Sequence, residues 1–181
     1  KYKEAGFSTP TRKFELSSTI LEKMGYDPLP QFREPPESPV STPQLYAKYP
    51  YILITGARQP GFFHTENRQV PWLRELHPDP TVEVHPDTAA KEGIQEGDWV
   101  IIESLRGKIR QRAKLFAGMD PRVVAAQHAW WFPEKKEPGH GWDESNINIL
   151  TDNAYETMDP AMGASSIRTL LVKIYPEIKS E

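Results

Sequence analysis

The sequence predicts an all-β fold, a barrel or sandwich of about six or seven strands. Three observations support this class. Short segments of alternating apolar and polar residues recur roughly every ten residues. Turn signals rich in Gly, Pro and Asp separate these segments. The helical patterns between them are only one or two turns long. With 181 residues, the chain suits one domain preceded by an extended segment.

The first 49 residues are expected to form an extended lead-in and linker with one short helix. Residues 7–16 are predicted to be an edge strand, because apolar and charged side chains alternate at their end. A helix is expected over residues 19–24, with serines before it as caps and Gly25 at its end. Such a helix is too short to be stable alone and must dock onto something. Proline-rich residues 28–48 are predicted to be an extended connector.

The barrel is expected to occupy residues 50–176, with a frayed tail at 177–181. Val82 and Val84 are predicted to point into its core. The expected strands are residues 50–55, 81–85, 99–103, 108–116, 123–126 and 168–175.

Two short helices are expected between these strands. Residues 72–76 form the first, which ends before a His-Pro pair. Residues 86–93 form the second, with Asp87 or Thr88 as its cap and Gly93 at its end.

Composition excludes several classes of function. The chain has no cysteine, so it holds no disulfide, thiolate metal site or Fe–S cluster of its own. A net charge of −3 without a basic stretch argues against a nucleic-acid partner. No apolar run is long enough for a transmembrane helix, so no membrane contact by this chain is expected. The spacing of the five histidines is not that of a local metal site. The sequence also lacks a recognisable pairing of a nucleophile with a base, which argues against a self-standing enzyme.

Two polar loops are the candidate ligand site. The first loop follows the apolar strand at residues 50–55, and a strand that ends in a Gly turn commonly presents amides and side chains to a ligand. Arginines in this loop can clamp phosphate. The candidate residues of the first loop are Thr55, Gly56, Arg58, His64, Thr65, Arg68 and Gln69. A solvated loop without a ligand remains an alternative interpretation.

The second polar loop covers residues 128–151 and contributes Asn148, whose amide can bind the edge of a heterocycle. It also holds the aromatic run Trp130-Trp131-Phe132, which either stacks on a ring or seals a buried pocket. Adjacent tryptophans more often pack into a core or an interface, so both interpretations stay open.

Five segments of the chain resemble one family, in the order in which that family has them. The most specific is His85-Pro-Asp-Thr-Ala-Ala-Lys-Glu-Gly-Ile-Gln-Glu-Gly-Asp98, followed by a Ser-Leu-Arg-Gly hairpin. The sequence is similar to the C-terminal molybdopterin-dinucleotide-binding domain of the dimethyl-sulfoxide-reductase family of molybdenum and tungsten oxidoreductases. The five segments are residues 7–16, 55–69, 85–107, 148–151 and 163–174, so the resemblance extends over nearly the whole length of the chain.

This resemblance implies a six-stranded double-psi β-barrel that closes a large catalytic subunit over molybdopterin guanine dinucleotide. The remaining domains of that subunit would be its partners and would hold the molybdenum or tungsten. Any Fe–S cluster would lie in the missing N-terminal part, and an Fe–S electron-transfer subunit is a further expected partner. The chain opens at Lys1, so we expect a fragment of a longer polypeptide. Its compartment, bacterial or archaeal cytoplasm or periplasm, depends on an export signal expected in that missing part.

The resemblance also implies roles for the candidate residues. Those at 55–58 would line the pterin or pyrophosphate region, and those at 64–69 would follow along the same ligand. Asn148 would form a hydrogen bond to the edge of the pterin, and Trp130 would lie near the pocket. Alone, the chain is expected to lack oxidoreductase activity and to bind the cofactor weakly. The alternative is a non-catalytic double-psi barrel that recruits substrates, which would not need the two polar loops.

Overall fold

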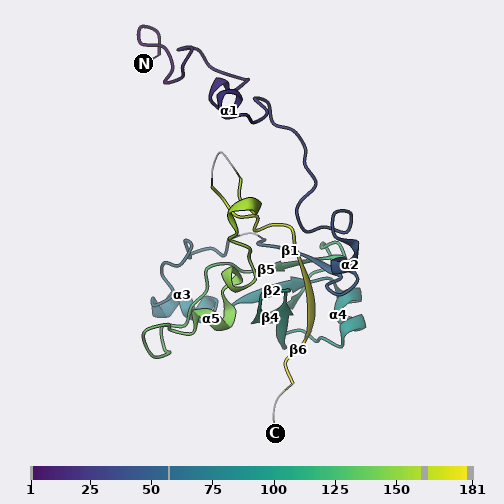
Figure 1. The fold of residues 1–181 in the computed structure, drawn as a ribbon. Helices are drawn as coiled ribbons and strands as arrows, with labels where there is room; N and C mark the ends of the chain where they lie inside the picture. The colour runs from purple at the N-terminus through teal and green to yellow at the C-terminus, as the bar shows by residue number, and fades with distance from the viewer. Residues whose placement is uncertain (1, 57, 160–162, 179–181) are drawn as a thin grey trace.

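The computed structural model describes residues 2–56, 58–159 and 163–178. A closed six-stranded barrel forms its body, and the N-terminal lead-in extends away from that barrel (Figure 1). The expected class, an all-β fold with a six-stranded double-psi β-barrel, is confirmed. The strands are β1 (Tyr51–Ile54), β2 (Thr81–Val84), β3 (Trp99–Glu103), β4 (Lys108–Leu115), β5 (Val123–Ala126) and β6 (Leu170–Pro176).

The strand order around the barrel is β1-β5-β2-β4-β3-β6, and the pairing of β1 with β6 closes it. β1 runs parallel to β5, with Ile54 opposite Ala125. Neighbouring parallel strands end at the same edge, so the segments after β1 and after β5 leave the barrel side by side. The topology therefore brings the two polar loops together at one end.

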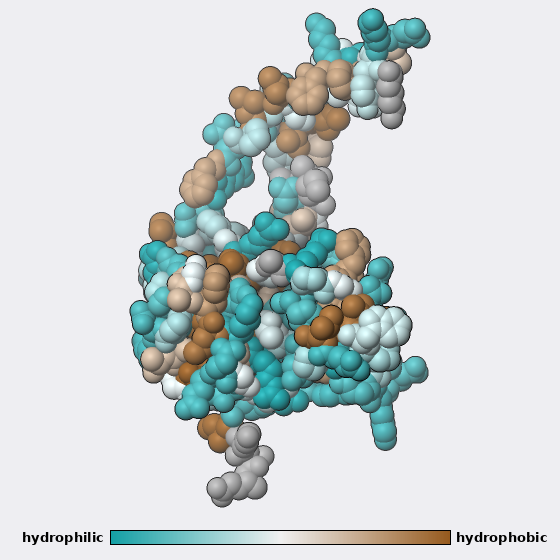
Figure 2. All heavy atoms as spheres, turned by 180° about the vertical axis from the view of Figure 1, so that it is seen from behind, coloured by the Kyte–Doolittle hydropathy of each residue, from teal (hydrophilic) through white to brown (hydrophobic). Residues whose placement is uncertain are grey.

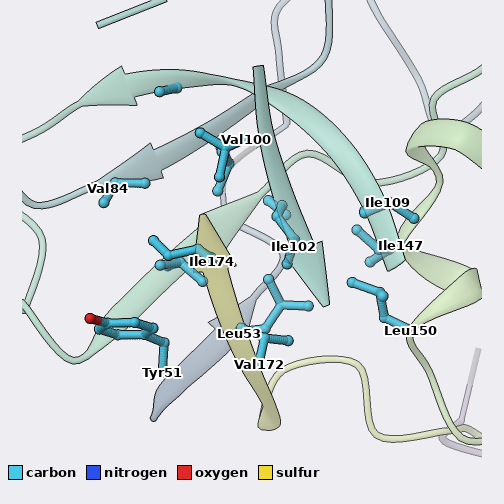
Figure 3. Close-up of a cluster of buried hydrophobic side chains, with 14 of the residues drawn as sticks. Tyr51, Leu53, Val84, Val100, Ile102, Ile109, Ile147, Leu150, Val172 and Ile174 are labelled. Atoms are coloured by element: carbon cyan, nitrogen blue, oxygen red, sulfur yellow. The ribbon is translucent and has the colours of Figure 1, made fainter. Parts of the chain in front are cut away.

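The barrel core is apolar and is built by alternation along the strands. Val82 and Val84 are completely buried, which confirms their predicted inward direction. Leu53 and Ile102 meet in the same core, among the side chains drawn in Figure 3. Burying each side chain of this size stabilises the fold by about 1.5–3 kcal/mol. One inward position of β4, Gln111, is polar.

The helices are all short. α4 begins after His85, whose Nδ1 accepts a 3.1 Å hydrogen bond from the backbone N–H of Asp87. The expectation of Asp87 or Thr88 as the cap is therefore wrong, while Gly93 ends the helix as predicted, with φ of 71°. The helices are α1 (Thr19–Lys23), α2 (Pro43–Tyr46), α3 (Pro71–Leu76), α4 (Pro86–Glu92), α5 (Trp142–Ser145) and the 3-10 helices η1 (Ile147–Ile149) and η2 (Tyr155–Thr157).

Three other expectations are corrected by the structure. Residues 7–16 form turns and not an edge strand, because they lie in the lead-in away from the barrel, whose six strands are all paired on both sides. The connector at residues 28–48 contains the single turn α2, which Pro43 begins at the position where proline suits a helix. The second loop is partly helical, since α5 and η1 lie within it.

The expected tail at residues 177–181 is only partly covered by the structure, because residues 179–181 lie outside the described ranges. Glu177 is not frayed: its backbone N–H donates a 2.8 Å hydrogen bond to the carbonyl of Trp99. Its carboxylate also pairs with Arg110 at 3.0 Å. Ordered chain therefore continues at least one residue past β6.

Candidate functional site

A small hollow of about 230 Å³ lies where the first loop leaves β1, and we refer to it as the strand-end hollow. Three predicted site residues, Thr55, Gly56 and Arg58, border it. Gly56 has φ of 60°, and a Cβ there would lie 3.3 Å from the Cβ of Ala125. Glycine is therefore favoured at this position by backbone conformation and by the closeness of β5. The other residues that line the strand-end hollow are Gln59, Pro60, Thr81, Glu83, Lys114, Ala125 and Gln127.

A larger hollow of about 690 Å³, the tryptophan hollow, lies between the two polar loops. Thr65 and Gln69, both predicted site residues, border it from the first loop. The indole N–H of Trp131 donates a 2.6 Å hydrogen bond to the carbonyl of Thr65, so the loops are joined directly. The remaining lining residues are Glu66, Asn67, Trp131, Gly139, His140, Trp142 and Asn146.

Cationic and imidazole side chains form a cluster that includes Arg58 of the strand-end hollow and His64, the neighbour of Thr65. The guanidinium of Arg58 lies 3.3 Å from Nε2 of His64. The rings of His64 and His128 meet edge to face, with centroids 5.7 Å apart. Arg68 donates a 3.1 Å hydrogen bond to the carbonyl of His64. The site thus gathers positive charge and potential positive charge from both loops.

Arg68 is a buried cation in this cluster, with only 2% of the residue exposed. Its guanidinium lies over the rings of Phe62, at 4.1 Å, and Trp130, at 4.4 Å. Its Nε and Nη1 atoms are buried and have no hydrogen-bond partner within the described part of the chain. No carboxylate among those residues pairs with it. Burial, and then the nearby charge of Arg74, lowers the pKa of Arg68 to about 10, so it remains charged at neutral pH.

His128 is the second unusual group of the cluster. Burial lowers its pKa, and the charges of His64, Arg58 and Arg68 lower it further. Its Nδ1 atom is buried without a hydrogen-bond partner in the described residues. Unpaired buried polar atoms are costly, and excess positive charge adds to that cost. A bound anion would relieve both, so the cluster has the chemistry of an anion site.

Trp130 does not border either hollow. It is completely buried and packs edge to face against Phe62, at 5.8 Å between ring centroids, and Phe132, at 6.3 Å. The expectation that Trp130 lies near the pocket stays a prediction. Trp131 faces the hollow, and Trp130 supports the guanidinium of Arg68 from within the protein.

Asn148 is exposed and borders neither hollow. Its backbone N–H donates a 3.1 Å hydrogen bond to Oδ1 of Asn146, which caps η1. Asn146 itself borders the tryptophan hollow. The role expected for Asn148 stays a prediction. Asn146 and Asn148 lie in the same polar stretch, so the sequence alone does not distinguish between them.

Two kinds of feature are absent from the described residues. No group of three or more His, Asp or Glu side chains there is arranged to hold a metal ion. Within the same ranges, no helix has the length and apolar character needed to cross a membrane.

Residues 51–169 match the family model described as a molydopterin dinucleotide binding domain. Dopamine dehydroxylase of Eggerthella lenta is 45% identical over 174 residues, which are 94% of this chain and 17% of that protein. Acetylene hydratase of Syntrophotalea acetylenica is 33% identical over 94% of this chain and 24% of its own length. In both comparisons the chain spans less than a quarter of the length of the relative that it matches.

The solved structure of acetylene hydratase from Pelobacter acetylenicus is similar to this fold, with a TM-score of 0.85 and 32% sequence identity. The alignment covers 96% of this chain and 25% of that structure's chain. The coverage is so complete that most of the lead-in is aligned together with the barrel.

Proposed function

The chain belongs to the molydopterin dinucleotide binding domain family, and on this basis we propose that it is the cofactor-binding domain of a molybdenum or tungsten oxidoreductase. Its cofactor would be molybdopterin guanine dinucleotide, which supplies the redox chemistry when bound. The protein's part is to bind the dinucleotide, orient it and exclude water. The observation that carries this proposal is the guanidinium of Arg68, which is buried beneath the two polar loops and whose Nε and Nη1 atoms have no hydrogen-bond partner in the described residues.

The cationic cluster suits the pyrophosphate of such a dinucleotide in two layers. Arg58 and His64 are exposed and can contact phosphate oxygens directly. Arg68 and His128 lie beneath them, where low dielectric strengthens the field of a buried charge. The outer layer would therefore supply hydrogen bonds, and Arg68 of the inner layer would supply positive potential. Thr55 and Gly56 would present the adjoining backbone to the same part of the ligand.

The tryptophan hollow suits a bicyclic ring of the cofactor. Trp131 and Trp142 offer aromatic faces for stacking. The carboxylate of Glu66 makes no ion pair or hydrogen bond within the described ranges, so it can accept from the N–H edge of a pterin or a guanine. Gln69 and Asn146 would contribute amide contacts along the same edge.

We also propose that the lead-in packs on the remaining domains of a longer catalytic subunit. Apolar side chains are exposed along the lead-in (Figure 2). Leu16 is 80% exposed and Phe32 is 87% exposed. α1 has no buried residue in this structure. Exposed apolar surface of this extent indicates a contact with another part of the protein. An Fe–S cluster in that part and an Fe–S electron-transfer subunit are further proposals, which rest on the resemblance.

The proposal is tested by the pterin content of the purified full-length protein. Arg58→Gln should retain at least tenfold less pterin than the wild type, because a direct phosphate contact is lost. Arg122→Gln is the matched control, since Arg122 is an exposed arginine before β5, at the opposite end of that strand from the site. The control should retain pterin normally. Equal retention in both variants would overturn the proposed site.

A further inference from the structure

The buried amide of Gln111 links β4 to the second polar loop. Gln111 is completely buried, at 0% exposure, between the apolar positions Ile109 and Ala113 on the inward face of β4. A primary amide without hydrogen bonds would be costly there. The amide of Gln111 must therefore have hydrogen-bond partners, and a hydrophobic side chain at this position could not form those bonds.

Three hydrogen bonds satisfy this amide. Its Oε1 accepts from the backbone N–H of Gln127 at 2.9 Å. Its Nε2 donates to the carbonyl of Gln127 at 2.7 Å and to the carbonyl of Ser145 at 3.0 Å. The two carbonyls use both N–H groups, so the partners fix the orientation of the amide.

The two partners lie near opposite ends of the second loop. Gln127 follows β5 and borders the strand-end hollow. Ser145 ends α5 and directly precedes Asn146 of the tryptophan hollow. One side chain thus holds the backbone beside both hollows against the same strand. Gln111 touches neither hollow itself, so any effect on a ligand would pass through the loop.

We propose that Gln111 is a positioning residue that fixes the spacing between the two hollows by anchoring both ends of the second loop. Its effect on cofactor binding rests on the function proposed above. The anchoring itself does not, because it concerns only the backbone of the loop. Ser145 has a second bond to β4, from its hydroxyl to the carbonyl of Arg110 at 2.8 Å, so loss of Gln111 loosens the loop without releasing it.

The test is hydrogen–deuterium exchange of the cofactor-free full-length protein carrying Gln111→Met, a substitution of similar volume without hydrogen bonds. Amides around Ser145 should exchange at least tenfold faster than in the wild type, and those around Gln127 should exchange faster by a smaller factor, because the Gln127 N–H also donates to the carbonyl of Thr81 at 3.0 Å. Amides of β3 should keep their rates. Gln111→Glu should retain the bond from the Gln127 N–H but lose both donated bonds, to the carbonyls of Gln127 and Ser145, so that Ser145 loses its only contact with this side chain. Its exchange should therefore increase more near Ser145 than near Gln127.

Ile102→Val is the control, since Ile102 is equally buried in the barrel and touches neither loop end through a polar atom. It should leave exchange in the second loop unchanged. Equal exchange in wild type and Gln111→Met, or the same increase in the control, would overturn the anchoring role. Global unfolding of both Gln111 variants would also overturn it, since the role concerns the loop and not the barrel.

Pterin content then separates this inference from the proposed function. A loosened loop in Gln111→Met should lower pterin retention at least threefold relative to wild type. Normal retention with a loosened loop would overturn only the coupling of Gln111 to the cofactor. Absence of pterin from the wild type would overturn the proposed function and leave the anchoring result standing.

Discussion

Nε of Arg106 donates a 2.8 Å hydrogen bond to the carbonyl oxygen of Leu150, which ties the turn between β3 and β4 to the end of the second loop. The same guanidinium pairs at 2.5 Å with Glu37 of the lead-in. Glu37 in turn accepts a 3.2 Å hydrogen bond from the backbone N–H of Leu171 in β6. Arg106 therefore joins the lead-in, the hairpin turn and the second loop.

Replacement of Arg106 should be strongly destabilising, because it leaves the carboxylate of Glu37 largely buried without its partner. The two side chains are only 19% and 12% exposed. We expect Arg106→Met to lower the free energy of unfolding by about 3 kcal/mol. Denaturant unfolding measures this loss, and adding Glu37→Gln should recover part of it. Arg33→Met, which breaks the exposed pair with Asp27, should cost less than about 1 kcal/mol. Equal costs for the two arginines would contradict the buried pair.

Gly107 allows the hairpin turn to lie close to the second loop. A Cβ at this position would lie 2.8 Å from Cγ2 of Ile149 and 3.1 Å from its carbonyl oxygen. Gly107→Ala should therefore cost about 1–3 kcal/mol through overpacking. At Gly139, the nearest atom to an added Cβ is 3.5 Å away, in Trp142, so Gly139→Ala should change stability by less than about 0.5 kcal/mol. Thermal unfolding of the two variants compares them directly.

Arg68 should matter more for anion binding than for stability. Its charge is buried without a carboxylate partner in the described structure, so Arg68→Met should change the free energy of unfolding by less than about 1 kcal/mol. The same substitution should weaken binding of inorganic pyrophosphate to the cofactor-free protein at least tenfold. Calorimetric titration measures this affinity. A large loss of stability with unchanged pyrophosphate affinity would mean that Arg68 serves the fold alone.

Acidification should destabilise the site through His128. Its folded-state pKa lies below the unfolded value of about 6.5, so the unfolded chain binds more protons in this range. Stability should therefore be fully present above about pH 6.5 and fall as the pH drops through the folded pKa. His128→Gln should flatten this dependence in denaturant unfolding. In an NMR titration, bound pyrophosphate should raise the pKa of His128, and an unchanged pKa would place the anion elsewhere.

The barrel could be predicted from the sequence because its strands carry their own periodicity. The alternation around Val82 and Val84 depends only on neighbours in the chain, and so does the Gly93 helix end. Residues 7–16 show the limit of this reasoning: they alternate in the same way but form no strand, because a strand also needs a pairing edge in space.

The site was predictable as two loops but not as a set of contacts. Thr55, Gly56, Arg58, Thr65 and Gln69 do border the hollows. Which neighbour in Trp130-Trp131 faces a hollow depends on the local backbone direction, which the sequence did not specify. The burial of Arg68 between aromatic rings depends on packing of segments far apart in the chain.

The place of β6 in the barrel has a consequence for biosynthesis. β6 pairs with both β1 and β3, so neither of those edges is covered until residues 170–176 have left the ribosome. Exposed strand edges invite pairing with other chains and are natural targets for chaperones. Nascent chains interrupted shortly before Leu170 should therefore aggregate, because the final strand of the barrel is needed to cover the edges of both β1 and β3.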